Sequence, residues 1–253
     1  MPELDRDAVP IHYEVTGSGP VVLFSHGYSA TADMWRPQLE PIGSRYTLVT
    51  WDMRGHGSSG DPEDPDQYSE EHTVADMVAI LDAVGAEKAA VGGLSLGGYM
   101  SLAFHRVHAE RVAALLLFDT GPGYRNDEAR DGWNANAYKT ADRLEERGLD
   151  GIRRGAEARE ARHRSAKGLA HAARGMLAQR DARVMDHLEK VDIPTLVLVG
   201  ADDEPFLKAT DVMAAKIPGA TKVTIPDAGH AANIDQPEHF NDAVLAFLGG
   251  VQW

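Results

Sequence analysis

Short apolar runs alternate along this chain with segments of helical periodicity, and this alternation constrains the fold more than any other feature. The runs expected to form strands cover residues 11–15, 21–25, 47–52, 88–94, 113–119, 194–199 and 222–225. The segments with helical spacing cover residues 72–84, 97–107, 206–217 and 237–248. Continuous apolar runs indicate strands buried on both faces. We therefore predict an α/β fold in which helices cover both faces of a mostly parallel sheet.

The alternation is interrupted between residues 121 and 190. This segment is rich in Ala, Arg and Glu, contains several glycines and has few strand signals. We interpret it as several short helices that form an inserted cap, with residues 1–120 and 191–253 forming the core domain. The segment contains 15 Lys and Arg against 12 Asp and Glu, while the remainder contains 10 against 27. Solvated helix faces explain this excess most simply, and attraction of an anionic substrate is the alternative.

Composition excludes several classes of function. The formal net charge of −14 argues against nucleic-acid binding, which needs a basic surface. The absence of cysteine excludes disulfides, thiolate catalysis and cysteine-ligated metal sites. Residues 1–9 lack the features of a signal peptide, and no apolar run is long enough to span a bilayer. We expect a cytoplasmic protein, monomeric or homodimeric, that does not bind membranes.

The strongest chemical signal is the turn between a predicted strand and a predicted helix. Residues 93–97 read GLSLG, a G-x-S-x-G motif followed by a further glycine. Such a turn holds its serine in a strained conformation, so that Ser95 Oγ projects away from the sheet. Neighbouring positions must be small, and the helix that follows directs its N-terminal N–H groups at charge that develops beside the serine. We therefore predict that Ser95 is a nucleophile.

A serine hydroxyl is a weak nucleophile at neutral pH and needs a base within hydrogen-bond reach. Of the 11 histidines, His230 is distinguished by its position. It lies in the loop between the last predicted strand and the last predicted helix. In a parallel sheet this loop falls at the carboxyl edge, beside the serine turn. We predict that His230 is the general base.

The base needs a carboxylate to hold its tautomer and stabilise the imidazolium. Asp202 and Asp203 follow the predicted strand at 194–199, and Asp119 ends the preceding strand. We favour Asp203 and keep Asp202 and Asp119 as alternatives. With Asp203, the chain order is serine, acid, histidine.

Hydrolysis through a tetrahedral intermediate also needs N–H donors for the developing oxyanion. We expect one donor to be the backbone N–H of Leu96, directly after the nucleophile. The loop after the strand at 21–25 should supply the second, from Tyr28, because Gly27 permits a sharp backbone path. We interpret His26 as a structural residue that holds this loop, although it resembles a second base.

Together these segments resemble the α/β-hydrolase superfamily across nearly the whole chain. The resemblance rests on residues 26–27, the segment DMRGHGSS at 52–59, residues 93–98, residues 200–203 and residues 229–230. It implies an eight-stranded sheet with a cap inserted after the sixth strand, and a structural role for residues 54–58. In that family the acid usually lies three residues after the strand-end glycine, which selects Asp203 over Asp202.

A serine at the nucleophile position separates this chain from family members that carry aspartate there, such as haloalkane dehalogenases and epoxide hydrolases. The chain looks most like the carboxylesterases and 3-oxoadipate enol-lactonases, which implies a small-molecule ester or lactone substrate. We predict a serine hydrolase that cleaves carboxylic esters of small molecules through an acyl-enzyme intermediate. Hydrolysis of enol-lactones or of carbon–carbon bonds with the same triad is the alternative. A small-molecule receptor on a hydrolase fold is an alternative of another class. We expect no cofactor and no metal, since no H-E-x-x-H or comparable ligand spacing is present.

Overall fold

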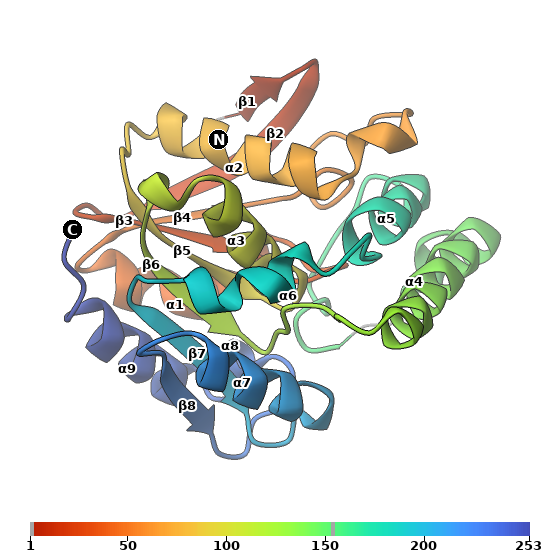
Figure 1. Ribbon diagram of the computed structural model, residues 1–253. Coiled ribbons are helices and arrows are strands. Elements are labelled where there is room, and N and C mark those ends of the chain that lie inside the picture. The colour runs from red at the N-terminus through yellow and green to blue at the C-terminus, as the bar shows by residue number, and fades with distance from the viewer. Residues whose placement is uncertain (1–2, 153–154) are drawn as a thin grey trace.

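The structure is a computed structural model that describes residues 3–152 and 155–253. Its described strands form one sheet of eight strands in the order β1-β2-β4-β3-β5-β6-β7-β8 (Figure 1). β1 and β2 run antiparallel to their neighbours, and the pairings from β4 to β8 are parallel. The strands are β1 (Glu3–Arg6), β2 (Val9–Thr16), β3 (Val21–Ser25), β4 (Thr47–Trp51), β5 (Ala89–Leu94), β6 (Val112–Phe118), β7 (Thr195–Gly200) and β8 (Thr221–Ile225). The predicted α/β fold with a mostly parallel sheet is confirmed.

Helices cover both faces of the sheet. One face carries α1 (Arg36–Gly43), α8 (Ala232–Asp235) and α9 (Pro237–Leu248). The other carries α2 (Glu70–Ala83), α3 (Leu96–Val107), α6 (Arg183–His187) and α7 (Glu204–Lys216). Short 3₁₀ or π turns complete the described helices: η1 (Ala32–Trp35), η2 (Pro65–Gln67), η3 (Ala109–Arg111), η4 (Gly148–Gly151), η5 (Ala173–Leu177) and η6 (Leu188–Lys190).

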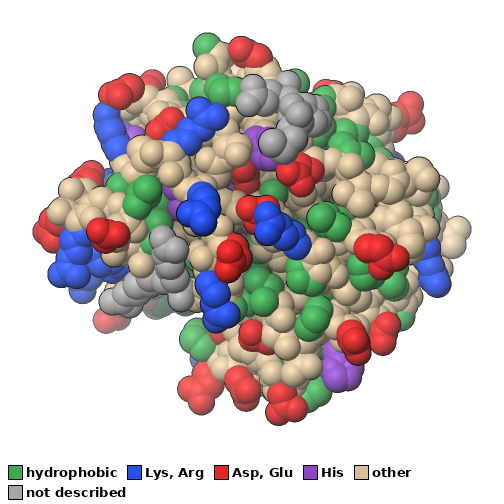
Figure 2. Space-filling view, turned by 180° about the vertical axis from the view of Figure 1, so that it is seen from behind, with side chains coloured by type: hydrophobic (Ala, Val, Ile, Leu, Met, Phe, Trp, Pro, Cys, Tyr) green, Lys and Arg blue, Asp and Glu red, His purple; other side chains and the backbone are tan. Residues whose placement is uncertain are grey.

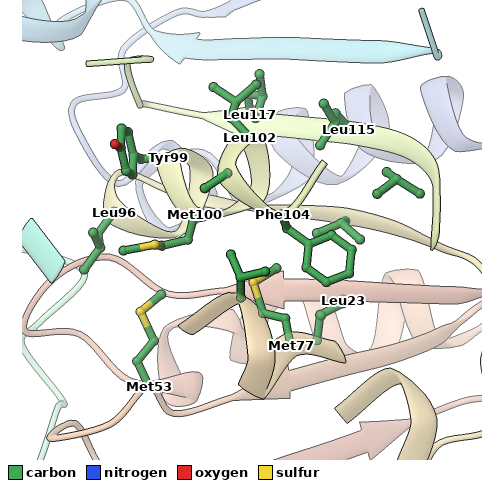
Figure 3. Packing of buried hydrophobic residues seen from close by; sticks show 14 of the residues in the cluster. Leu23, Met53, Met77, Leu96, Tyr99, Met100, Leu102, Phe104, Leu115 and Leu117 are labelled. Carbon is green, nitrogen blue, oxygen red and sulfur yellow. The ribbon is translucent and has the colours of Figure 1, made fainter. Parts of the chain in front are cut away.

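The apolar core lies in two layers, one on each side of the sheet. Every residue of β5, β6 and β7 is buried, as expected for central parallel strands covered on both faces. On one side Leu23, Leu115 and Leu117 pack against Met77 and Phe104 from α2 and α3 (Figure 3). On the other side the aromatic rings of Phe24, Trp35, Phe118 and Phe240 contact one another. Packing in these two layers holds the ends of the strands in place, and the loops that follow those ends carry the candidate site residues.

The segment between β6 and β7 is helical. It contains α4 (Asp127–Arg147) and α5 (Ala166–Ala172), which pack on each other beyond one end of the sheet (Figure 1). The expectation of several short helices is wrong for the first part, because α4 runs unbroken for 21 residues. Gly132 does not end the helix: its position is exposed, and a Cβ there would contact nothing within 4 Å.

A small apolar cluster holds the inserted segment together and joins it to the rest of the protein. Ala141, Leu144 and Leu169 form its buried centre, and Tyr28 from the loop after β3 packs against it. The hydroxyl of Tyr28 donates a hydrogen bond of 2.9 Å to the carbonyl of Leu169. His163 adds a second link, since its Nε2 bonds to the carbonyl of Ser29 at 3.0 Å.

Several charged side chains of the inserted segment form ion pairs, either within the segment or with neighbouring elements. Arg174 contacts Asp142 and Glu145 at 2.6 Å each, and Lys167 contacts Glu63 at 2.6 Å. On the face shown in Figure 2, acidic and basic side chains are interspersed. These contacts favour solvated helix faces as the explanation of the basic excess. No helix among the described residues is long and apolar enough to cross a membrane.

β1, α1 and the short α8 have no counterpart among the strands and helices expected from periodicity. β1 has the polar sequence ELDR and pairs only with β2 at the edge of the sheet, where burial imposes little pattern. α1 contains Pro37 and Pro41, which read as turn residues in the sequence. Its buried Ile42 packs in the apolar layer on the α9 side. Packing therefore stabilises a helix that propensity alone disfavours.

Candidate active site

The site begins at the turn that connects β5 to α3. Ser95 has φ 54° and ψ −113°, outside the regions that non-glycine residues favour, so the turn is strained. Its backbone is held on both sides: the N–H donates to the carbonyl of Phe118 at 3.0 Å, and its own carbonyl accepts from Thr120 Oγ1 at 2.5 Å. The packed end of β6 thus maintains the strained conformation.

Close packing around the turn leaves no space for side chains at its glycines. A Cβ at Gly93 would lie 2.4 Å from the carbonyl oxygen of Ser25, and one at Gly97 would lie 2.2 Å from the same atom. At Gly98 it would lie 2.5 Å from Thr120 Cγ2. The small residues of the motif are therefore required by contact with β3 and with the segment that follows β6, as the motif predicted.

His230 and Asp203 are brought together from two loops at the same edge of the sheet. His230 Nδ1 lies 2.9 Å from Asp203 Oδ2. Asp203 is 3% exposed and immediately precedes α7, but its side chain caps no helix N–H and is left for the histidine. The two loops approach closely, because a Cβ at Gly200 would lie 2.3 Å from the carbonyl oxygen of Gly229.

The surroundings of His230 shift its proton affinity. Burial lowers the pKa of His230, but the hydrogen bond and the negative charge of Asp203 outweigh burial and leave the pKa raised above its usual value. The ring of Phe206 stacks on the imidazole with 5.0 Å between centroids and 23° between planes. This contact limits rotation of the ring.

The two alternative acids do not contact the histidine. Asp202 is exposed, although its backbone N–H donates to the carbonyl of Ala228 at 2.9 Å. Asp119 is buried, and its Oδ1 accepts the N–H of Gly200 at 2.7 Å. Burial raises the pKa of Asp119 well above its usual range. The geometry therefore pairs Asp203 with His230, and Asp119 ties the end of β6 to the end of β7.

Ser95 and His230 line one cavity of about 260 Å³, which Tyr28 also lines. Among the described residues, the hydroxyl of Ser95 makes no hydrogen bond to His230. Hydrogen bonds between catalytic groups are often long until substrate binds. The backbone N–H groups of Tyr28 and Leu96 have no hydrogen-bond acceptor among the described residues. Leu96 is the first residue of α3, so its N–H carries the positive end of the helix dipole.

The loop of His26 and Gly27 adjoins the serine turn. A Cβ at Gly27 would lie 3.1 Å from Leu94 Cδ2 and 3.5 Å from Ser95 Cβ, so glycine allows the close approach. His26 uses both ring nitrogens: Nδ1 bonds to the carbonyl of Gly27 at 2.7 Å, and Nε2 accepts the N–H of Met53 at 3.0 Å. Burial lowers its pKa, and the nearby charge of Asp52 opposes this shift. These contacts engage His26 in holding the loop.

The segment at 54–58 is held by a buried ion pair. Arg54 is 1% exposed and binds Asp76 through two hydrogen bonds, Nε to Oδ2 at 2.7 Å and Nη2 to Oδ1 at 2.8 Å. Its Nη1 donates to Gln67 at 2.7 Å. Neither Arg54 nor Asp76 lines the cavity at Ser95.

The cavity also reveals residues that the sequence analysis did not select. Arg143 and Glu157 line it with Ser95, and nothing in their sequence context distinguishes them from surface charges. Trp133 and Leu177 of the inserted segment also line the cavity, and the sequence does not show whether such apolar residues belong to the core or to a pocket. Tyr138, another aromatic side chain of α4, is 46% exposed and does not line the cavity.

Arg159, Arg162 and Arg164 of the inserted segment could in principle bind a carboxylate, but they do not line the cavity at Ser95. Arg159 and Arg162 line separate hollows, and Arg164 donates to the carbonyl of Ser58 at 2.6 Å. Arg153 and Arg154 lie outside the described residues. Within residues 3–152 and 155–253, no group of three His, Asp or Glu side chains is arranged to hold a metal ion.

Comparison with known proteins gives consistent matches over the chain. The family described as "alpha/beta hydrolase fold" matches residues 20–149. The 3-oxoadipate enol-lactonase 1 of Acinetobacter baylyi is 28% identical over 271 residues, covering 98% of this chain and 96% of that protein.

Two solved structures are similar to this chain in both sequence and fold. A thermophilic esterase from Thermogutta terrifontis is 31% identical with a TM-score of 0.81, covering 95% of this chain and 93% of the other. The enol-lactonase from Burkholderia xenovorans LB400 is 25% identical with a TM-score of 0.80, covering 98% of this chain and 100% of the other. The similarity therefore includes both the sheet and the helical segment inserted after β6.

Proposed function

Because the chain belongs to the α/β-hydrolase family, we propose that it is a serine hydrolase that cleaves carboxylic esters of small molecules through an acyl-enzyme intermediate. Ser95 is the nucleophile, His230 the general base and Asp203 the acid. The observation that carries the proposal is the 2.9 Å contact between Asp203 and His230, in a cavity that the strained Ser95 also lines. The proposal is supported by the position of the three residues in the chain, because each follows the end of a parallel strand: β5, β7 and β8.

In the first step, Asp203 accepts the Nδ1–H of His230, which leaves the Nε2 lone pair for the serine proton. Ser95 Oγ forms a bond to the ester carbonyl carbon while its proton passes to Nε2. The carbonyl oxygen becomes an oxyanion, which the N–H groups of Tyr28 and Leu96 stabilise. Collapse of this intermediate breaks the bond to the leaving alkoxide, which takes the proton from Nε2 and departs as an alcohol.

In the second step, water replaces the alcohol. His230 removes a proton from the water, whose oxygen attacks the acyl carbon and forms a second oxyanion. The bond to Ser95 Oγ breaks, the serine recovers the proton, and the carboxylic acid leaves. Besides the ester and one water molecule, the two steps balance with groups of the chain itself.

Residues 121–190 act as a cap on the core domain of residues 1–120 and 191–253. Trp133, Arg143 and Leu177 from this segment form part of the cavity wall, which supports a role in substrate selection. Its contacts through Tyr28 connect it to the loop expected to supply an oxyanion donor.

The test combines covalent labelling with turnover. Wild-type protein and Ser95→Ala are incubated with a fluorophosphonate, and their intact masses are measured. Both are then assayed on p-nitrophenyl acetate and butyrate. We expect one adduct on the wild type only, and a fall in kcat of roughly 10⁴-fold or more in the variant. Absence of both adduct and turnover in the wild type refutes Ser95 as an activated nucleophile.

Enol-lactone hydrolysis is the second candidate, because two of the similar proteins are named as enol-lactonases. It uses the same steps, except that the leaving oxygen remains tethered to the acyl group in the product. A panel of five- and six-membered lactones beside linear esters of the same acids separates the two activities. Higher kcat/KM for the lactones favours the second candidate.

A further inference from the structure

The space around Ser95 has two lobes. Ser95, Trp133, Leu177 and Phe206 border both of them. The first lobe has about 130 Å³ and is lined also by Leu96, Tyr99, Pro122 and Ala209. The second has about 260 Å³ and is lined also by Tyr28, Thr140, Arg143, Glu157 and His230. A substrate bound at Ser95 therefore has two directions in which its parts can extend.

The position of His230 decides which part of an ester enters which lobe. This inference rests on the proposed function, in which His230 gives its proton to the leaving alcohol oxygen. That transfer requires the oxygen to lie within hydrogen-bond reach of the imidazole. His230 lines the second lobe and not the first. The alcohol part therefore extends into the second lobe, and the acyl part into the first.

The first lobe fits a short apolar acyl group. Three polar side chains on its wall have partners within the protein: the Tyr99 hydroxyl donates to Glu70 at 3.1 Å, Thr120 donates to the Ser95 carbonyl, and Gln179 Oε1 accepts the N–H of Tyr124 at 3.2 Å. The remaining wall offers mainly apolar surface from Leu96, Pro122 and Ala209. Its volume is close to that of the roughly 150 Å³ cavity known to hold benzene, which corresponds to about six carbon atoms.

The second lobe fits a larger and more polar group. Arg143 is half-buried there; its Nε donates to the carbonyl of Gly151 at 2.7 Å and its Nη2 to Thr140 Oγ1 at 3.5 Å. No ion pair among the described residues involves Arg143, unlike Arg174 of the same segment, which binds two carboxylates. A guanidinium has five N–H donors and no acceptor. Arg143 therefore has donors available for a substrate group that accepts hydrogen bonds.

We propose that the substrates are esters of a short apolar acid with a larger alcohol that carries a hydrogen-bond acceptor, with the acyl group in the Ala209 lobe and the alcohol in the Arg143 lobe. Ala209 and Arg143 are then specificity-determining residues for opposite ends of the ester. Ala209 lines only the first lobe and Arg143 lines only the second. The preference for the acyl group and the preference for the alcohol can therefore be changed independently.

The experiment measures two specificity ratios in the full-length protein. The acyl ratio compares kcat/KM for p-nitrophenyl hexanoate with that for the acetate. The alcohol ratio compares 4-carbamoylbenzyl acetate with benzyl acetate. The variants are Ala209→Leu, the milder Ala209→Val, and Arg143→Met. Lys208→Leu, at an exposed neighbour of Ala209 on α7 that lines neither lobe, is the control. Fluorophosphonate labelling of every protein reports the state of Ser95.

We expect an alcohol ratio of about ten in the wild type, because one hydrogen bond from a charged donor is worth about that factor. Ala209→Leu should lower the acyl ratio at least tenfold, Ala209→Val should lower it less, and both should keep the alcohol ratio, because a pocket distinguishes single methylenes by roughly 10–200-fold. Arg143→Met should reduce the alcohol ratio to about one and keep the acyl ratio.

The lobe assignment is overturned if the Ala209 variants change the alcohol ratio and Arg143→Met changes the acyl ratio, or if neither ratio changes in any variant. In either case, labelling at Ser95 still upholds the proposed function. A wild type that neither labels nor turns over any ester overturns both. If Ala209→Leu does not fold, Ala209→Val alone decides the acyl arm.

Discussion

Replacing Asp203 with asparagine changes one charge in the proposed triad and little else. The side chain is 3% exposed, so the substituted amide occupies the same enclosed space beside His230. Asparagine can donate an N–H to Nδ1, which moves the ring hydrogen to Nε2. His230 then cannot accept the proton of Ser95. The oxyanion donors and the nucleophile remain in place.

The size of the effect follows from the loss of the productive tautomer. The same substitution in a serine protease triad lowers kcat by about 10⁴, and we expect kcat/KM to fall by about 10³–10⁴ here. At about 1.4 kcal/mol for each factor of ten, this is a loss of about 4–5.5 kcal/mol of transition-state stabilisation. Asp202→Asn should stay within about twofold of wild type, because Asp202 is exposed and lies outside the contact with His230.

The pH profile gives a second readout of the same substitution. The free base is the active form, so activity rises with pH through the pKa of His230. That pKa is raised in the wild type. The rise of activity on the acid side of the profile, called the acid limb, should therefore have its midpoint above the usual histidine pKa of about 6.5. Without Asp203 the effect of burial remains, so the limb should move to lower pH. Measurement of kcat/KM on p-nitrophenyl acetate from pH 5 to 9 tests both effects. A large loss in Asp202→Asn with near-normal Asp203→Asn refutes the reasoning.

Three further outcomes are expected. Gly97→Ala should lower the urea midpoint strongly, because its Cβ would lie 2.2 Å from a backbone oxygen. Gly132→Ala, at an open helix position, should raise stability by about 0.5–1 kcal/mol. Equal effects of the two substitutions would contradict the conclusion that close packing requires glycine at position 97. Arg54→Met should cost about 3 kcal/mol in urea unfolding, because it removes both hydrogen bonds to the buried Asp76 and leaves that carboxylate only the 3.6 Å contact with Arg6; a cost below about 1 kcal/mol would count against this. The negative charge of ionised Asp119 helps raise the pKa of His230, so Asp119→Asn should shift the acid limb of kcat/KM to lower pH. Because burial raises the pKa of Asp119 itself, an unchanged limb would show that Asp119 is already protonated there and would refute this coupling.

Local patterns in the sequence were enough to identify most of the sheet and the positions around it. Val21–Ser25 and Pro237–Leu248 were predicted to the residue, and the central strands within one residue, because burial on both faces imposes continuous apolar runs. The strained turn at Ser95 and the loop of His230 follow from motif and chain order in the same way. These features depend on neighbours in the sequence, so the sequence alone specifies them.

Contacts between distant segments required the tertiary structure. Asp203 rather than Asp202 or Asp119 faces His230 because of the path of the backbone after β7, and periodicity does not encode that direction. Arg143 resembles any surface arginine in the sequence, and only the packing of α4 over the sheet edge brings it into the cavity with Ser95. Sequence periodicity reports which residues are buried, whereas the direction in which a side chain points across a cavity depends on how whole elements pack.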